Sequence, residues 1–124
     1  MALQPCVYET HWIVYNGKLN LTVNVRSNDI ALGNPYNVYQ YFVLLKMIAQ
    51  VTNYESGELC FNIDIPHIYD RHIETITKQI ENKPFKQPTF TLNQEVTSFY
   101  DFSIQDVKVE NYNHHGKVEY EIAI

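Results

Sequence analysis

The pair Asn16-Gly17 constrains the fold of this chain more than any other local feature, because it separates two runs rich in β-forming residues. Cys6–Tyr15 precedes the pair and Lys18–Val25 follows it. Asparagine and glycine tolerate the positive φ angles that a type I′ hairpin turn requires. The second run alternates apolar and polar residues, so we predict a strand with one buried and one polar face. Arg26 follows at the end of that strand.

A long helix is predicted directly after a polar stretch, RSNDIALGNPYN, at residues 26–37. Asn34 is a good N-cap residue, Pro35 fits the first helical position, and no further helix breaker occurs before Thr52. The nearly all-round apolar character of this segment predicts a helix buried in the core. Polar interruptions at Gln40 and Lys46 leave the apolar run too short to cross a bilayer, so no membrane span is expected.

The second part of the chain predicts shorter elements after a turn at Tyr54–Gly57. They are a strand at Glu58–Ile65 that stops before Pro66, an amphipathic helix over about Ile68–Glu81, and short strands at Thr89–Leu92, Ser103–Tyr112 and Val118–Ile124. Strands and helices do not alternate regularly, which favours an α+β fold over a doubly wound sheet. A chain of 124 residues that is 45% hydrophobic fits one domain.

Composition argues against a nucleic-acid-binding surface and indicates the cellular compartment. The net charge is −5 and the arginines are Arg26 and Arg71 alone, so a basic surface for nucleic acid is not expected. The two cysteines, Cys6 and Cys60, are expected to be free thiols in a reducing compartment, which indicates the cytoplasm.

Taken singly, the residues that could carry chemistry have ordinary structural explanations. Cys6 is either a small buried thiol or a nucleophile, and a nucleophile needs a nearby cation to favour its thiolate. Arg26 is a candidate for that cation, although a single arginine more often pairs with a surface carboxylate. Cys60, within an apolar strand, is expected to pack in the core.

The histidines do not predict a metal site. His67 and His72 are five residues apart, which places them off a shared helical face, and no carboxylate or thiol completes a ligand set. His114 and His115 lie in a predicted turn and are expected to be solvated.

Several motifs occur together in a specific order: MALQPC, RSNDIALGNPYN, MIAQVT, HIYDRHIE and the terminal EIAI. In that order they resemble the C-terminal half of thymidylate synthase, and the resemblance extends over residues 1–124 as one domain that lacks the N-terminal half. It implies an α+β fold with a mixed sheet, a long buried helix and a second amphipathic helix. It also implies reductive methylation of dUMP to dTMP, with methylenetetrahydrofolate consumed as cosubstrate to give dihydrofolate, and no metal.

The resemblance assigns roles by position. Cys6 matches the nucleophile, and Arg26, Asp29 and Asn37 match further catalytic positions. The residues that match dUMP ligands are Arg26, Ser27, Asn37, His67 and Tyr69, and those that match the folate-facing wall are Asp29, Leu32, Gly33, Tyr36 and Ile124. Asp64-Ile65 differs from the Gly-Asp pair that the family usually has before the site histidine.

The family's first half supplies a general-base glutamate, a folate-facing tryptophan and further phosphate arginines, some of them donated across a symmetric dimer. We therefore expect the isolated chain to be incomplete and inactive alone. Its expected partners are dUMP, folate, and either another copy of itself or a complementing N-terminal half. The alternative hypothesis is a noncatalytic truncated remnant or self-associating fragment.

Overall fold

The computed structural model describes residues 4–122 and contains the predicted hairpin. Strand β1 (Val7–Tyr15) pairs antiparallel with β2 (Lys18–Asp29) across a turn in which Asn16 and Gly17 have φ angles of 49° and 75°. Positive φ at both central positions is the geometry of a type I′ turn, so this prediction is confirmed. The strand β2 is longer than predicted, and Arg26 lies inside it rather than after it.

The core forms between β2 and the helix α1 (Gly33–Val51). Buried side chains alternate along β2 as predicted, and they pack against two helix residues one turn apart. The members of this cluster are Leu19, Leu21, Val23, Val25, Leu45 and Ala49. Burying a branched aliphatic side chain contributes roughly 1.5–3 kcal/mol, so this contact fixes the helix against the sheet.

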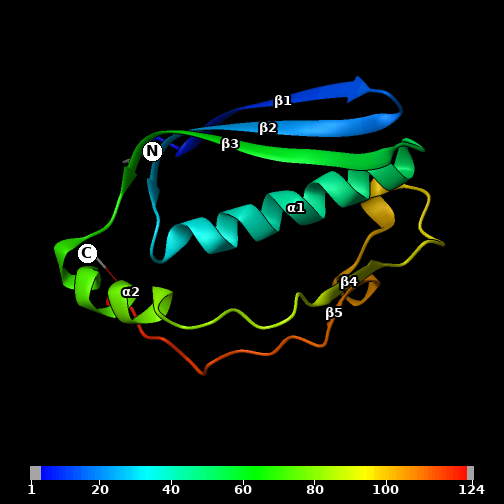
Figure 1. Cartoon of the computed structure of the whole chain (residues 1–124). Coiled ribbons are helices and arrows are strands. Elements are labelled where there is room, and N and C mark those ends of the chain that lie inside the picture. The colour runs from blue at the N-terminus through cyan, green and yellow to red at the C-terminus, as the bar shows by residue number, and fades with distance from the viewer. Residues whose placement is uncertain (1–3, 123–124) are drawn as a thin grey trace.

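Helix α1 connects two parallel neighbours, β2 and β3 (Glu55–His67), in a three-stranded sheet of order β1-β2-β3. The sheet is therefore mixed, and the α+β class is confirmed. Figure 1 shows the sheet on one side of α1 and the short β4–β5 ribbon on the other. The helix packs in the core through Leu45 and Ala49 as predicted, but its apolar character does not bury every side, since Tyr36, Val38 and Tyr39 are exposed.

The ends of α1 differ from the prediction. The helix begins at Gly33 with Leu32 at the N-cap position, while the Asn34 side-chain oxygen accepts a hydrogen bond of 3.0 Å from Asn28 Nδ2. Asn34 therefore ties the helix to β2 instead of capping it. At the other end Asn53 has a φ of 58° and the Tyr54 N–H donates to the Ala49 carbonyl, which is a Schellman ending. The predicted turn at Tyr54–Gly57 is wrong, because the turn comes earlier and β3 already starts at Glu55.

Strand β3 continues past the proline that was expected to end it. Pro66 pairs with Asn28 and His67 pairs with Asp29, because β3 lies at the sheet edge, where a proline is tolerated. Cys60 points away from the core and is exposed, contrary to the packing prediction. Leu59, on the opposite face of the same strand, contacts the core instead.

The strand β4 (Thr89–Leu92) has the predicted bounds, and it pairs with β5 (Val107–Glu110), which is shorter than predicted. The other elements are the helix α2 (Ile73–Ile80), also shorter than predicted, and the 3-10 turns η1 (Asp70–His72), η2 (Phe99–Asp101) and η3 (Ile104–Asp106). The predicted helix at Ile68–Glu81 and strand at Ser103–Tyr112 are thus each replaced in part by 3-10 turns. Residues 118–122 contain no strand. Within residues 4–122, no helix combines the length and apolarity needed to span a bilayer.

Substituting Gly57 tests the register of β2 and β3. A Cβ at Gly57 would lie 2.3 Å from Asn20 Oδ1, which accepts a 2.9 Å hydrogen bond from the Glu58 N–H. Gly57→Ala should therefore displace the Asn20 side chain and lower the free energy of unfolding by about 1–3 kcal/mol. Urea unfolding followed by circular dichroism measures the change. In an Asn20→Ala background the same substitution should cost less, and strictly additive effects would contradict this explanation.

Candidate functional site

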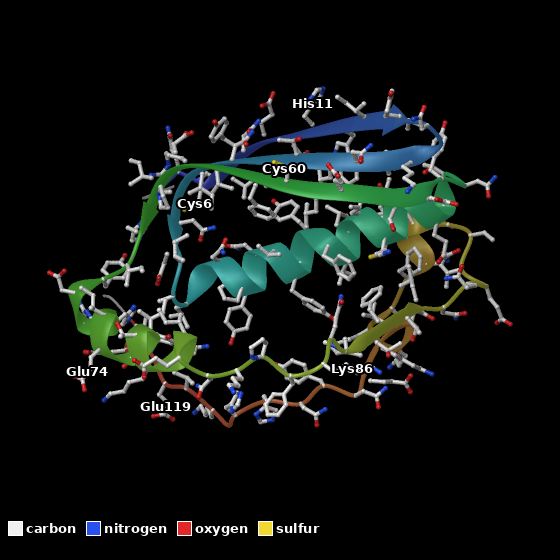
Figure 2. All side chains as sticks on the ribbon, in the orientation of Figure 1. Cys6, His11, Cys60, Glu74, Lys86 and Glu119 are labelled. Carbon is white, nitrogen blue, oxygen red and sulfur yellow. The ribbon has the colours of Figure 1, made fainter. Side chains whose placement is uncertain are left out.

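Cys6 and Arg26 lie together at one end of the sheet. Arg26 Nη2 lies 3.9 Å from Cys6 Sγ and donates to the Gln4 carbonyl at 3.1 Å, and the Arg26 backbone N–H donates to the Cys6 carbonyl at 2.7 Å. Cys6 is exposed, so the expectation of a small buried thiol does not hold. Figure 2 shows Cys6 beside the ends of the strands that lead toward α1 and α2. The fold thus brings a guanidinium to an accessible thiol.

The segment after Arg26 is held by side-chain hydrogen bonds to its own backbone. Asp29 Oδ1 accepts from the Ala31 N–H at 3.0 Å and from the Leu32 N–H at 3.2 Å. Ser27, one position after Arg26 and half-buried, lies on β2 opposite Ile65 of β3. These contacts give the last residues of β2 a defined conformation before the helix begins.

The first turn of α1 presents three predicted site residues at this end of the sheet. The position where a Cβ would project from Gly33 is 3.7 Å from Asp29 Cβ and 3.8 Å from Asn37 Oδ1. Asp29 and Asn37 therefore both lie next to Gly33. Tyr36 is 74% exposed and projects away from the core.

Strand pairing brings His67 to the same place. His67 is the register partner of Asp29, and its carbonyl accepts from the Ile30 N–H at 2.9 Å. His67 Nδ1 lies 3.3 Å from the Ile65 carbonyl, and its ring meets the Tyr69 ring edge-on at 5.1 Å. Ile65 therefore contacts the histidine through its backbone carbonyl, and its exposed side chain takes no part in that contact.

A cavity of about 660 Å³ opens beside the predicted folate-facing residues. Leu32 and Tyr36 line one side, while Gln79 of α2 and the C-terminal residues Val118 and Tyr120 line the other. Burial raises the pKa of Tyr120, and the negative charge of Asp29 raises it further. The C-terminal segment and the end of β2 are thus close in space.

The cavity is also lined by three residues that the sequence did not indicate as site residues: Gln79, Lys117 and Tyr120. Their local patterns contain no signal for a site, because a short amphipathic helix and a polar terminal segment occur in most small domains. Ile124, predicted to close over the folate, lies outside the described residues. Within residues 4–122 no group of three potential ligands for a metal ion is found.

Comparison with known proteins identifies the family. The thymidylate synthase family model matches residues 1–124. Thymidylate synthase 1 of Bacillus subtilis (strain 168) is 56% identical over 124 residues, and the thymidylate synthase of Bacillus phage phi3T is 54% identical. The chain belongs to the thymidylate synthase family. The resemblance inferred from the motifs is therefore confirmed.

Thymidylate synthase structures share this fold. A thermostable thymidylate synthase A from Bacillus subtilis matches with a TM-score of 0.96 at 56% identity, covering 100% of this chain and 45% of that chain. The two curated thymidylate synthases above are likewise covered to 44% of their length. The chain thus spans less than half the length of these relatives.

The proximity of Tyr120 to Asp29 can be measured by titration. Tyr120 should ionise above the ordinary tyrosine pKa of about 10. Asp29→Asn removes a negative charge that disfavours the phenolate, so the pKa of Tyr120 should fall while burial keeps it above the ordinary value. Carbon-13 NMR of ring-labelled tyrosine measures this, with Tyr120→Phe for assignment.

The matched control for this titration is Asp64→Asn. Asp64 raises the pKa of Tyr8 through its charge and a hydrogen bond, although desolvation is the larger cause. The control should therefore lower the pKa of Tyr8 and leave that of Tyr120 unchanged. An unchanged Tyr120 pKa in Asp29→Asn would show that the C-terminal segment does not lie against Asp29.

Proposed function

We propose that this chain supplies the nucleophile-bearing part of a thymidylate synthase active site, which converts dUMP to dTMP with methylenetetrahydrofolate as cosubstrate. The observation that carries the proposal is the accessible Cys6 thiol beside the Arg26 guanidinium, in a chain of this family. The folate supplies the one-carbon unit and the hydride and leaves as dihydrofolate. The free thiols suit the cytoplasm.

Cys6 provides covalent catalysis in this proposal. Its thiolate adds to C6 of the uracil ring, and the electron pair displaced from the C5–C6 double bond makes C5 nucleophilic toward the one-carbon unit. A base from the remaining part of the enzyme then takes the C5 proton, and the electron pair of that C–H bond expels the folate nitrogen from the methylene carbon. The tetrahydrofolate gives its hydride to this carbon, the Cys6–C6 bond breaks to restore the C5–C6 double bond, and the folate leaves as dihydrofolate. Arg26 and Ser27 hold the phosphate, and the Arg26 charge also favours the thiolate.

Asn37 reads the base in this proposal. Its amide oxygen accepts from uracil N3–H while its NH₂ group donates to O4, a pattern that cytosine reverses. A mismatched base would leave polar groups unpaired, which gives discrimination. His67 and Tyr69 hold the deoxyribose hydroxyl. Asp29, Leu32, Gly33 and Tyr36 face the folate, and Ile124 completes that wall.

Covalent trapping tests the proposed reaction. We expect 5-fluoro-dUMP and methylenetetrahydrofolate to form a ternary adduct with the chain once a separate N-terminal half of a thymidylate synthase is added. The adduct is visible as an increase in intact mass. Cys6→Ser should abolish the adduct, because the hydroxyl is a much weaker nucleophile at neutral pH. Cys60→Ser is the matched control and should keep it, since Cys60 lies on the polar face of β3. A complemented, folded chain that forms no adduct would refute the enzymatic proposal and favour a noncatalytic fragment.

We also propose a partner for the outer face of α1. An apolar groove of about 660 Å³ is formed there by one helix face and by Ile104 and Val107; its helix residues are Tyr39, Gln40, Tyr41, Val43, Leu44 and Met47. The curated relatives have more than half their length beyond the matched region. We infer that polypeptide equivalent to this remaining part covers the groove, which would otherwise leave an unusually apolar helix half-exposed.

Two charged substitutions distinguish this partner from self-association. Met47→Glu places a carboxylate in the groove and should weaken binding of the remaining part of Bacillus subtilis thymidylate synthase 1 at least about tenfold. Ile13→Glu, at an exposed site on β1, is the control and should leave this binding unchanged. Calorimetry measures binding of the remaining part, and sedimentation measures self-association of the chain. If Ile13→Glu dissolves a homo-oligomer while the remaining part does not bind, the self-associating fragment is the better description.

A further inference from the structure

His72 is an almost completely buried polar residue. It ends the turn η1 directly before α2, and its residue surface is 1% exposed. Burying an imidazole costs free energy unless its polar atoms find partners. Neither the metal hypothesis nor the resemblance gives this residue a role, so its surroundings require an explanation.

The partner of His72 is the C-terminal segment. His72 Nε2 lies 2.8 Å from the Glu121 carbonyl oxygen, 49 positions along the chain. A carbonyl oxygen can only accept, so Nε2 carries the proton and donates. This fixes the tautomer and makes the bond independent of the Glu121 side chain.

The His72 ring also lies between two aromatic rings. It meets Tyr69 edge-on at 5.6 Å and Tyr120 edge-on at 5.1 Å. Aromatic pairs at such distances and angles contribute roughly 0.5–1.5 kcal/mol beyond area burial. His72 therefore joins a predicted substrate residue, Tyr69, to the terminal segment.

The terminal segment needs such an anchor, because residues 117–122 have no strand or helix to hold them. Its further contacts are a Tyr120 hydroxyl hydrogen bond to Gln79 Oε1 and an exposed ion pair of 3.6 Å between Arg71 and Glu121. An exposed ion pair contributes little to stability. The buried His72 contacts, together with the Tyr120 hydrogen bond, therefore hold a segment that forms one wall of the cavity lined by Leu32 and Tyr36.

We propose that His72 is a positioning residue that fixes residues 120–122 and thereby sets the cavity wall opposite Leu32 and Tyr36. Its effect on folate binding rests on the proposed function, whereas the anchoring itself does not. His72 touches no reacting atom in this proposal. It acts through Tyr120, whose ring moves if the Glu121 carbonyl is released.

Chymotryptic cleavage after Tyr120 tests the anchoring. Tyr120 must leave the His72 ring to enter the protease, so in His72→Leu we expect this cleavage to accelerate about tenfold, the typical net value of one lost hydrogen bond with its packing, while β2 and α1 stay resistant. His72→Gln, whose amide nitrogen reaches the place of Nε2, should restore most of the resistance. Arg71→Gln removes only the exposed ion pair with Glu121 and should change the cleavage rate less than twofold. An unchanged cleavage rate in His72→Leu would overturn the proposal.

A kinetic measurement separates positioning from general stability. In the complemented enzyme, His72→Leu should raise the KM for methylenetetrahydrofolate about tenfold with kcat for the bound complex changed less. The KM for dUMP should rise less than that, because Tyr69 keeps its edge contact with His67 when its contact with His72 is lost. Equal losses for both substrates would refute selective positioning. If the unmodified complemented chain has no activity, the proposed function fails, while the cleavage rate after Tyr120 still decides whether His72 anchors the segment.

Discussion

The contact between β2 and α1 is the constraint on which the rest of this structure depends. Val23 and Val25 are completely buried against the helix, and the same strand continues without a break into Arg26 and Asp29. A slip of one residue in β2 would turn these apolar side chains to solvent and carry the polar ones inward. The core therefore fixes the direction of the residues that form the candidate site. The same strand supplies both core residues and candidate site residues.

The sequence predicted those elements whose signals are local. The Asn16-Gly17 turn and the alternation along β2 each follow from a few adjacent residues, and both are present. The predictions that failed depend on distant partners. Strand β3 passes through Pro66 because it lies at a sheet edge, and Cys60 is exposed because Leu59 and Phe61 take the core face. Neither fact can be read from the strand's own composition.

The candidate site shows the same division. Short motifs were enough to select Cys6, Arg26 and Asn37 as candidates, and the fold places all three around the junction of β2 and α1. The contact of His72 with Glu121 joins residues far apart in the sequence, and the spacing of this histidine from His67 argued against a metal site without indicating any other role. Without coordinates, a buried positioning histidine and a solvated one have the same local pattern. Side-chain burial was the missing information.

The site is assembled from two parts that differ in rigidity. The thiol and guanidinium belong to a hydrogen-bonded hairpin, where the Arg26 N–H is bonded to the Cys6 carbonyl. The wall that contains Tyr120 belongs to a segment without regular structure, held by a few side-chain contacts. Opening such a segment costs far less than opening the core. The part of the candidate site around Cys6 and Arg26 is therefore fixed by the sheet, whereas the wall that contains Tyr120 depends on a few side-chain contacts.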